Sequence, residues 1–96
     1  MQIYQAKDGQ LAEHLFESDT QTVTHLQIKA GKSVPRHKSP NYVVVVIYKG
    51  KVIFSTDDDR VELCPGTIVR MVPDEYHSLQ ALEDSDLMVV KSKLKE

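Results

Sequence analysis

Residues 31–50 read GKSVPRHKSPNYVVVVIYKG and include the segment of the chain that most favours a β-strand, residues 42–48. β-branched and aromatic side chains are enriched in strands. Apolar residues occupy both faces of this predicted strand, with Val43, Val45 and Ile47 on one face and Val44 and Val46 on the other. A strand of this kind is normally covered on both sides. We therefore expect one face to point into the protein interior and the other to lie against a further layer.

Turn signals built from Gly, Pro, Asp and Asn recur at short intervals along the 96 residues. The short segments between them are rich in Val, Ile, Thr, Tyr and Leu. This rhythm is typical of an all-β sandwich or barrel. Gly50 is predicted to make a tight turn, after which residues 52–54 return as the hairpin partner of the preceding strand.

Two segments are ambiguous by pattern alone. Residues 10–17 (QLAEHLFE) have leucines four apart, as a helix would, but the segment is too short for a stable isolated helix and is predicted to be a strand. In residues 68–72 the inward face holds either Arg70 or the pair Val69 and Met71. Burying an unpaired arginine is costly, so Val69 and Met71 are expected inside.

Composition narrows the class of protein. The chain is expected to form one domain, residues 1–96. Its net charge of −2, with no basic patch, gives nucleic-acid binding no electrostatic support, and its longest apolar run is too short to span a membrane. The N-terminus does not resemble a signal peptide and the single cysteine, Cys64, cannot form an internal disulfide, so a cytoplasmic location is expected. Cys64 itself is expected to be a small buried hydrophobe.

The spacing of glycine and histidine in residues 31–50 resembles the first motif of the cupin superfamily. That motif reads glycine, five residues, histidine, one residue, histidine, three residues, glutamate, six residues, glycine. The glycines and the first histidine of the motif are matched by Gly31, His37 and Gly50. Ser39 stands at the position of the second histidine and Val43 at that of the glutamate.

The second cupin motif, in which a histidine follows a glycine after eleven positions, is matched by Gly66 and His77. Three further motif residues, a proline, a glycine and an asparagine, are replaced by Val72, Asp74 and Ala81, and Pro73 is one place out of register. With both motifs in order, the chain resembles a small single-domain cupin of the conserved-barrel type. The resemblance implies an all-β fold, an antiparallel β-barrel of jelly-roll type.

The resemblance also implies that His37 and His77 project into the barrel. Cupins that bind a metal use two histidines and a glutamate from the first motif and one histidine from the second, and only these two histidines remain here. Ser39 offers a neutral hydroxyl and Val43 offers no ligand atom, whereas a stable site usually has at least three good ligands. At most a weakly bound divalent transition metal (Zn, Fe, Mn or Ni) is expected. Alternatively, the two histidines contact a bound ligand directly, or they are hydrogen-bonded residues at the edge of the core with no functional role.

Tyr76 and His25 are further candidates for the ligand site, beside His37, His77, Ser39 and Val43. Tyr76 directly precedes His77 and is expected at the rim of the pocket. His25 could turn inward as a third imidazole or remain a solvated strand residue. His14 has no supporting context.

Two functions from different classes stay open, because the family contains both and a fold does not choose between them. In the first, the barrel binds a small organic ligand and catalyses no reaction, which the losses at positions 39 and 43 favour. In the second, the chain is a metal-dependent oxygenase or isomerase of a small polar substrate. His25, Asp74 or Glu75 would then replace the lost metal ligands.

The outward valines predict a homodimer. The interior can cover only one face of residues 42–48, and Tyr42 and Tyr48 share the other face with Val44 and Val46. Exposed apolar patches mark association sites, and tyrosine is enriched in interfaces. The expected partners are therefore a small-molecule ligand and a second copy of the chain, with no nucleic acid and no membrane.

Overall fold

The computed structural model describes residues 1–94, which form nine β-strands. The strands are β1 (Ala12–Glu17), β2 (Gln21–Ile28), β3 (Ser33–His37), β4 (Tyr42–Lys49), β5 (Val52–Thr56), β6 (Arg60–Leu63), β7 (Ile68–Met71), β8 (His77–Ala81) and β9 (Ser85–Ser92). The ambiguous segment at residues 10–17 is strand β1, as predicted. Within residues 1–94 there is no helix of the length and hydropathy needed to cross a membrane.

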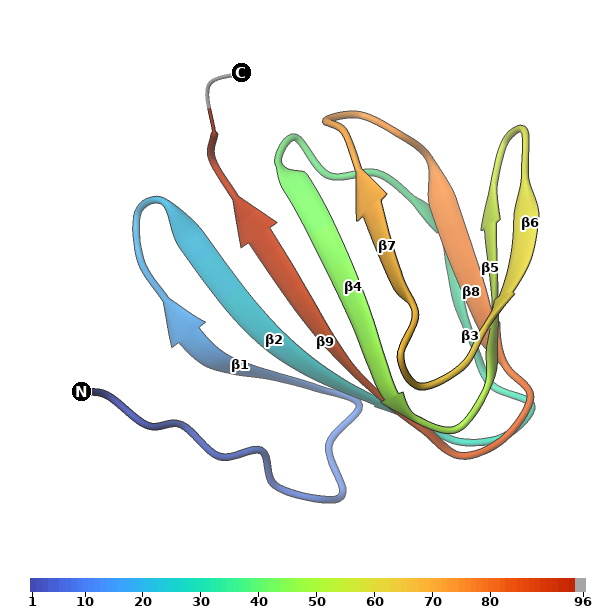
Figure 1. The fold of residues 1–96 in the computed structure, drawn as a ribbon, viewed down its shortest axis with the longest axis horizontal. Coiled ribbons are helices and arrows are strands. Elements are labelled where there is room, and N and C mark those ends of the chain that lie inside the picture. The colour runs from blue at the N-terminus through green and yellow to red at the C-terminus, as the bar shows by residue number, and fades with distance from the viewer. Residues whose placement is uncertain (95–96) are drawn as a thin grey trace.

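The strands form two antiparallel sheets. One has five strands in the order β1-β2-β9-β4-β7, and the other has four in the order β3-β8-β5-β6. In Figure 1 the five-stranded sheet occupies the left and centre of the view and the four-stranded sheet lies at the right. Among the described residues, no strand of one sheet pairs with a strand of the other. The fold is therefore a jelly roll of two facing sheets and not a fully closed barrel. The predicted all-β, jelly-roll class is confirmed.

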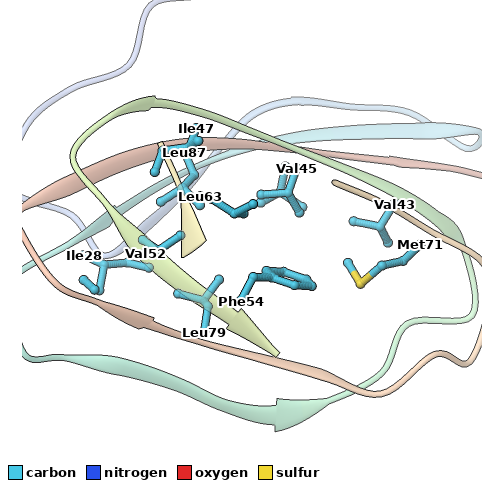
Figure 2. Packing of buried hydrophobic residues seen from close by; sticks show 12 residues of the cluster. Ile28, Val43, Val45, Ile47, Val52, Phe54, Leu63, Met71, Leu79 and Leu87 are labelled. Carbon is cyan, nitrogen blue, oxygen red and sulfur yellow. The ribbon is translucent and has the colours of Figure 1, made fainter. Parts of the chain in front are cut away.

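The core lies between the two sheets and comes from alternate residues of their strands (Figure 2). The three β4 residues predicted to point inward, Val43, Val45 and Ile47, are each at most 3% exposed. Phe54 and Leu79 contribute to the same core from the four-stranded sheet. The period of two that defines a strand thus places the predicted face of β4 inside.

The side chains of β7 point in the directions that were predicted from the cost of burying an arginine. Met71 is 1% exposed and Val69 packs against the core, whereas Ile68 is 60% exposed and Arg70 lies at the surface. The inward assignment of Val69 and Met71 is confirmed.

The predicted hairpin at Gly50 is wrong. Strand β4 pairs with β9 and β7, while β5 pairs with β8 and β6, so Gly50 carries the chain from one sheet to the other. Gly50 has φ of 88°, in the left-handed region that favours glycine. A glycine turn specifies a change of direction, but it does not specify which strand the next segment pairs with.

Cys64 is exposed, which corrects the expectation that it is buried. Its neighbour Leu63, the last residue of β6, takes the inward position and is 1% exposed. Successive side chains of a strand point to opposite faces, so Cys64 is turned outward.

Candidate functional site

A cavity of about 310 Å³ lies between the two sheets. Most of its lining is apolar and comes from Leu11, Ala12, Leu26, Val34, Val43, Val45, Phe54, Leu79 and Val89. The polar residues of its lining are His14, Thr24, His37, His77 and Lys91. Apolar walls with a few convergent polar groups are the usual composition of a small-molecule site.

His37 and His77 form a closely packed pair in the lining of the cavity. They lie opposite each other where β3 pairs with β8, and their ring centroids are 4.1 Å apart in an edge-to-face arrangement. His77 also stacks on the core residue Phe54, with 5.8 Å between ring centroids and 8° between ring planes. His77 is buried and His37 is exposed, so the pair extends from the core towards the cavity mouth.

The backbone determines which nitrogen of each ring is free. His37 Nδ1 donates to the carbonyl of Pro35 at 2.8 Å, and His77 Nδ1 donates to the carbonyl of Glu75 at 3.0 Å. A carbonyl oxygen only accepts hydrogen bonds, so in the neutral rings both protons are on Nδ1 and both Nε2 atoms keep a lone pair. The pair can therefore accept two hydrogen bonds from a ligand.

Burial keeps His77 in this neutral form. It lowers the pKa of His77 below the ordinary histidine value, and electrostatic interactions with His37 and Lys91 lower it further. The hydrogen bond to the carbonyl of Glu75 opposes this effect but does not reverse it. His77 is accordingly a hydrogen-bond acceptor at neutral pH.

The donor set around these histidines does not fit the metal centre of the fold family. Val43, which stands at the position of the family's glutamate, lines the same cavity and carries no ligand atom. Ser39 is buried away from the cavity lining, and its Oγ accepts a hydrogen bond of 3.2 Å from the amide of Asn41. Among residues 1–94, no three His, Cys, Asp or Glu side chains form a group that could hold a metal ion. Two imidazoles fall short of the three ligands that a stable site generally needs.

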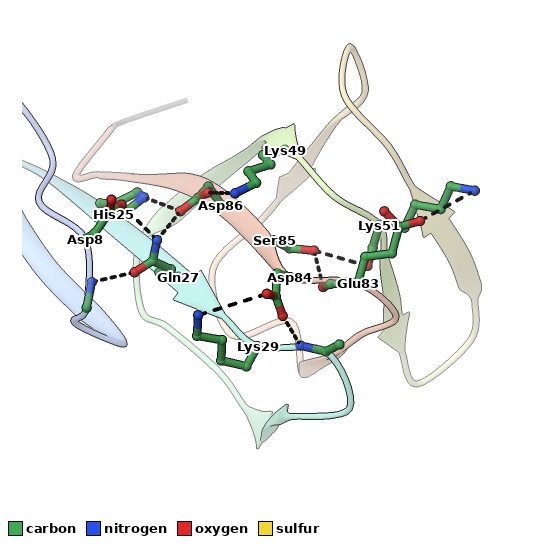
Figure 3. Close-up of polar contacts among 12 residues, drawn as sticks. Asp8, His25, Gln27, Lys29, Lys49, Lys51, Glu83, Asp84, Ser85 and Asp86 are labelled. Atoms are coloured by element: carbon green, nitrogen blue, oxygen red, sulfur yellow. Dashed lines mark hydrogen bonds and ion pairs between the residues drawn. The ribbon is translucent and has the colours of Figure 1, made fainter.

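His25 does not turn into the cavity, which corrects the expectation of a third imidazole at that position. It lies on the outer face of β2, yet it is only 2% exposed and so is not a solvated residue either. Its Nε2 lies 3.0 Å from Asp86 Oδ1, which also accepts a hydrogen bond from Gln27 (Figure 3). Pairing with a neighbouring-strand carboxylate satisfies one nitrogen of the buried ring on the outer face.

Tyr76 also lies outside the cavity lining, contrary to its expected place at the rim. The Arg36 guanidinium is 3.7 Å from the centroid of its ring, and the Lys38 ammonium is 5.2 Å away. Arg36 in turn makes two hydrogen bonds to Asp57, at 3.0 and 2.9 Å. Attraction of these cations to the aromatic face holds the tyrosine against them.

Neither acidic residue considered as a replacement metal ligand lines the cavity. Asp74 is exposed and has a positive φ of 66°, as the turn between β7 and β8 requires. Glu75 Oε1 accepts a hydrogen bond of 3.2 Å from the amide of Val72 within the same turn. Both side chains belong to the turn and not to the ligand site.

His14 and Lys91 are cavity residues that the sequence did not single out. His14 Nδ1 lies 2.7 Å from Thr24 Oγ1 on the neighbouring strand β2. His14 pairs in register with Thr24, and a shift of register after His14 places Phe16 opposite Val23, so the alternation of β1 does not continue along the whole strand. Lys91 lies within β9 on the cavity side.

The fold and the cavity agree with the comparisons to known proteins. A family model described as the AraC-like ligand binding domain matches residues 21–91. No curated protein matches the chain.

Solved structures show the same fold at low sequence identity. An RmlC-like cupin with a double-stranded β-helix fold from Methanocaldococcus jannaschii has a TM-score of 0.85 and 22% identity, with coverage of 97% of this chain and 91% of that one. A conserved protein of unknown function from Streptococcus pyogenes has a TM-score of 0.81 and 23% identity, covering 95% and 80%. An RmlC-like cupin from Desulfovibrio desulfuricans has a TM-score of 0.84 and 19% identity, covering 96% of each chain. These likenesses show that the chain has the fold of the small cupins. The family match over residues 21–91 shows that the chain belongs to the AraC-like ligand-binding domain family.

Proposed function

We propose that the chain is a binding module that holds a small organic molecule between its two sheets and catalyses no reaction on it. The observation that carries this proposal is the cavity of about 310 Å³ with its pair of imidazole acceptors, His37 and His77. The apolar lining would cover the body of the ligand, and its burial would supply most of the affinity. The two Nε2 lone pairs would select a ligand with a hydroxyl or amine donor at one end.

We expect phenol to bind more tightly than anisole, which has a similar shape but lacks the hydroxyl donor. In His77→Phe the aromatic ring can still stack on Phe54 but Nε2 is gone, so the preference for phenol should fall by about tenfold, the value of one hydrogen bond. His37→Phe should have the same direction of effect. Titration followed by amide chemical shifts measures both affinities.

The matched control is Tyr76→Phe, which changes an aromatic residue outside the cavity lining. It should leave the phenol preference unchanged. Equal binding of phenol and anisole by the parent, or a preference that survives both histidine variants, would show that the histidine pair does not recognise a donor.

The alternative function, a metal-dependent oxygenase or isomerase, requires ligands that the described residues do not bring together. Restoring a carboxylate tests this interpretation. Val43 is 2% exposed and lines the same cavity as both histidines, so Val43→Glu should complete a set of two histidines and one carboxylate. We expect the affinity for Zn²⁺ to rise at least tenfold, and the free energy of unfolding of the metal-free protein to fall by about 1–3 kcal/mol because an unpaired carboxylate is buried.

Calorimetric titration with Zn²⁺ and urea unfolding measure these two changes. Val44→Glu is the control, since the adjacent side chain points to the opposite face of β4 and cannot reach the histidines. A Val43→Glu variant with no gain in Zn²⁺ affinity and with parental stability would contradict the placement of Val43 beside His37.

A further inference from the structure

Among the described residues that line the cavity, Lys91 is the only lysine or arginine. It lies on β9 in register with Val43 of β4 and Thr22 of β2, and it shares the inward face of β9 with Val89 and Leu87. Four-carbon stems of lysine pack along apolar walls of this kind while the ammonium reaches a polar partner or water.

No carboxylate of residues 1–94 pairs with Lys91. By contrast, ion pairs are formed by Lys29, Lys49 and Lys51. The ammonium nitrogen of each lies 3.9–4.0 Å from a carboxylate oxygen of an aspartate or glutamate. Lys91 has no such partner within the described part of the chain, and none of the residues that line the cavity is acidic. An ammonium beside apolar walls is thus left without a counter-charge from these residues.

Strands β1 and β2 add further polar groups to the cavity lining. His14 and Thr24 are joined by their 2.7 Å contact and both line the cavity. Thr22, the register partner of Lys91, lies two positions before Thr24 on β2. A hydroxyl can donate to an anion, and the apolar surroundings strengthen the attraction between opposite charges relative to water.

The charge of Lys91 also acts across the cavity. It contributes to the lowered pKa of His77, after burial and the charge of His37. The cation and the histidine pair therefore belong to one electrostatic environment.

From this arrangement we propose that the ligand carries a carboxylate that pairs with Lys91, in addition to the donor group that the histidine pair accepts. The inference rests on the proposed binding function and specifies its ligand class: a small hydroxylated or aminated monocarboxylate with an apolar body. A single ammonium matches the single charge of a carboxylate.

Paired probes separate this inference from the proposed function. The probes are 4-hydroxybenzoate and 4-hydroxybenzamide, which share a ring and a hydroxyl but differ in charge. Calorimetric titration of the full chain at pH 8, where an ordinary histidine is neutral, leaves Lys91 as the cavity's cation. We expect the carboxylate to bind at least tenfold more tightly than the amide.

In Lys91→Gln the dissociation constants of the two probes should become nearly equal. Lys91→Arg should retain the preference for the carboxylate. Lys29→Gln, which removes the same charge from a side chain that is 72% exposed, is the control and should also retain it.

A parent protein that binds both probes equally, or a preference that persists in Lys91→Gln, overturns the carboxylate assignment but leaves the binding function intact. If neither probe binds at millimolar concentration, both the carboxylate assignment and the proposed binding function are overturned.

Discussion

Gly50→Ala should lower the free energy of unfolding by about 3 kcal/mol, the largest effect on stability that we expect from adding a single methyl group. Two costs add. The residue has φ of 88°, and holding alanine in the left-handed region costs about 1–2 kcal/mol. The new Cβ would also lie 2.8 Å from Ser85 Cα and in closer contact with the carbonyl oxygen of Asp84, and overpacking of this kind costs about 1–3 kcal/mol.

The neighbouring backbone cannot easily move away. Ser85 is 1% exposed. Its hydroxyl group can donate to two carbonyl oxygens, that of Lys51 at 3.2 Å and that of Glu83 at 2.8 Å (Figure 3). These contacts connect the start of β9 with the start of β5, at the point where the chain passes between the sheets. A shift at Ser85 would therefore disturb both.

Gly66→Ala is the matched control. Gly66 has φ of 98°, but a Cβ there would meet no atom within 4 Å, so only the conformational cost of about 1–2 kcal/mol is expected. Urea unfolding of the parent and both variants gives the three free energies. Equal losses for Gly50→Ala and Gly66→Ala would show that the close approach to Ser85 contributes nothing to stability.

Val46→Glu should weaken self-association by at least 100-fold. We expect the parent to be a homodimer through the outer face of the five-stranded sheet, where Val44 and Val46 are only partly buried and Ile68 is 60% exposed. Burial of one valine contributes about 1.5–3 kcal/mol, and a two-fold interface contains each position twice. Placing a carboxylate at both copies therefore removes about 3 kcal/mol or more of association free energy, which corresponds to that factor.

The N-terminal segment covers another part of this face. The Tyr4 ring lies 5.7 Å from that of Phe16 on β1, and both line a groove with Val23, Met88 and Val90. We expect the second copy to cover the part over β4 and β7, which contains Val46 and Ile68. Val46 therefore lies in the part of the face that the N-terminal segment leaves uncovered, whereas Val23 of β2 lies in the groove with Tyr4.

Sedimentation at micromolar concentration measures the association, and circular dichroism verifies that the variant is folded. Ile53→Glu is the control, because Ile53 is a half-buried β-branched residue on the outer face of the other sheet. It should not change the association. A monomeric parent, or a folded Val46→Glu variant that remains as strongly dimeric as the parent, would remove this interface.

The amino-acid sequence by itself determined the strand character of the chain and the direction of its side chains. The inward face of β4, the burial of Met71 instead of Arg70 and the strand at Ala12–Glu17 were all predicted correctly. These features depend on the period of two and on the cost of burying charge, which act within a few neighbouring residues. The two glycine and histidine motifs were sufficient to indicate the cupin fold, which the similar solved structures bear out.

The tertiary structure alone decided which strands pair and which side chains share the cavity. Strand β4 pairs with β9, some forty residues later, and not with β5. The whole fold brings β4 and β9 together, whereas the turn at Gly50 does not determine which strands pair. His25 is buried on the outer face because Asp86 on β9 pairs with it there, and His14 lies inside opposite the cavity residue Thr24 of β2. Lys91 faces the cavity because β9 continues as a central strand up to Ser92, between β2 and β4. Each of these outcomes depends on contacts between residues far apart in the chain, whose positions no local pattern of residues specifies.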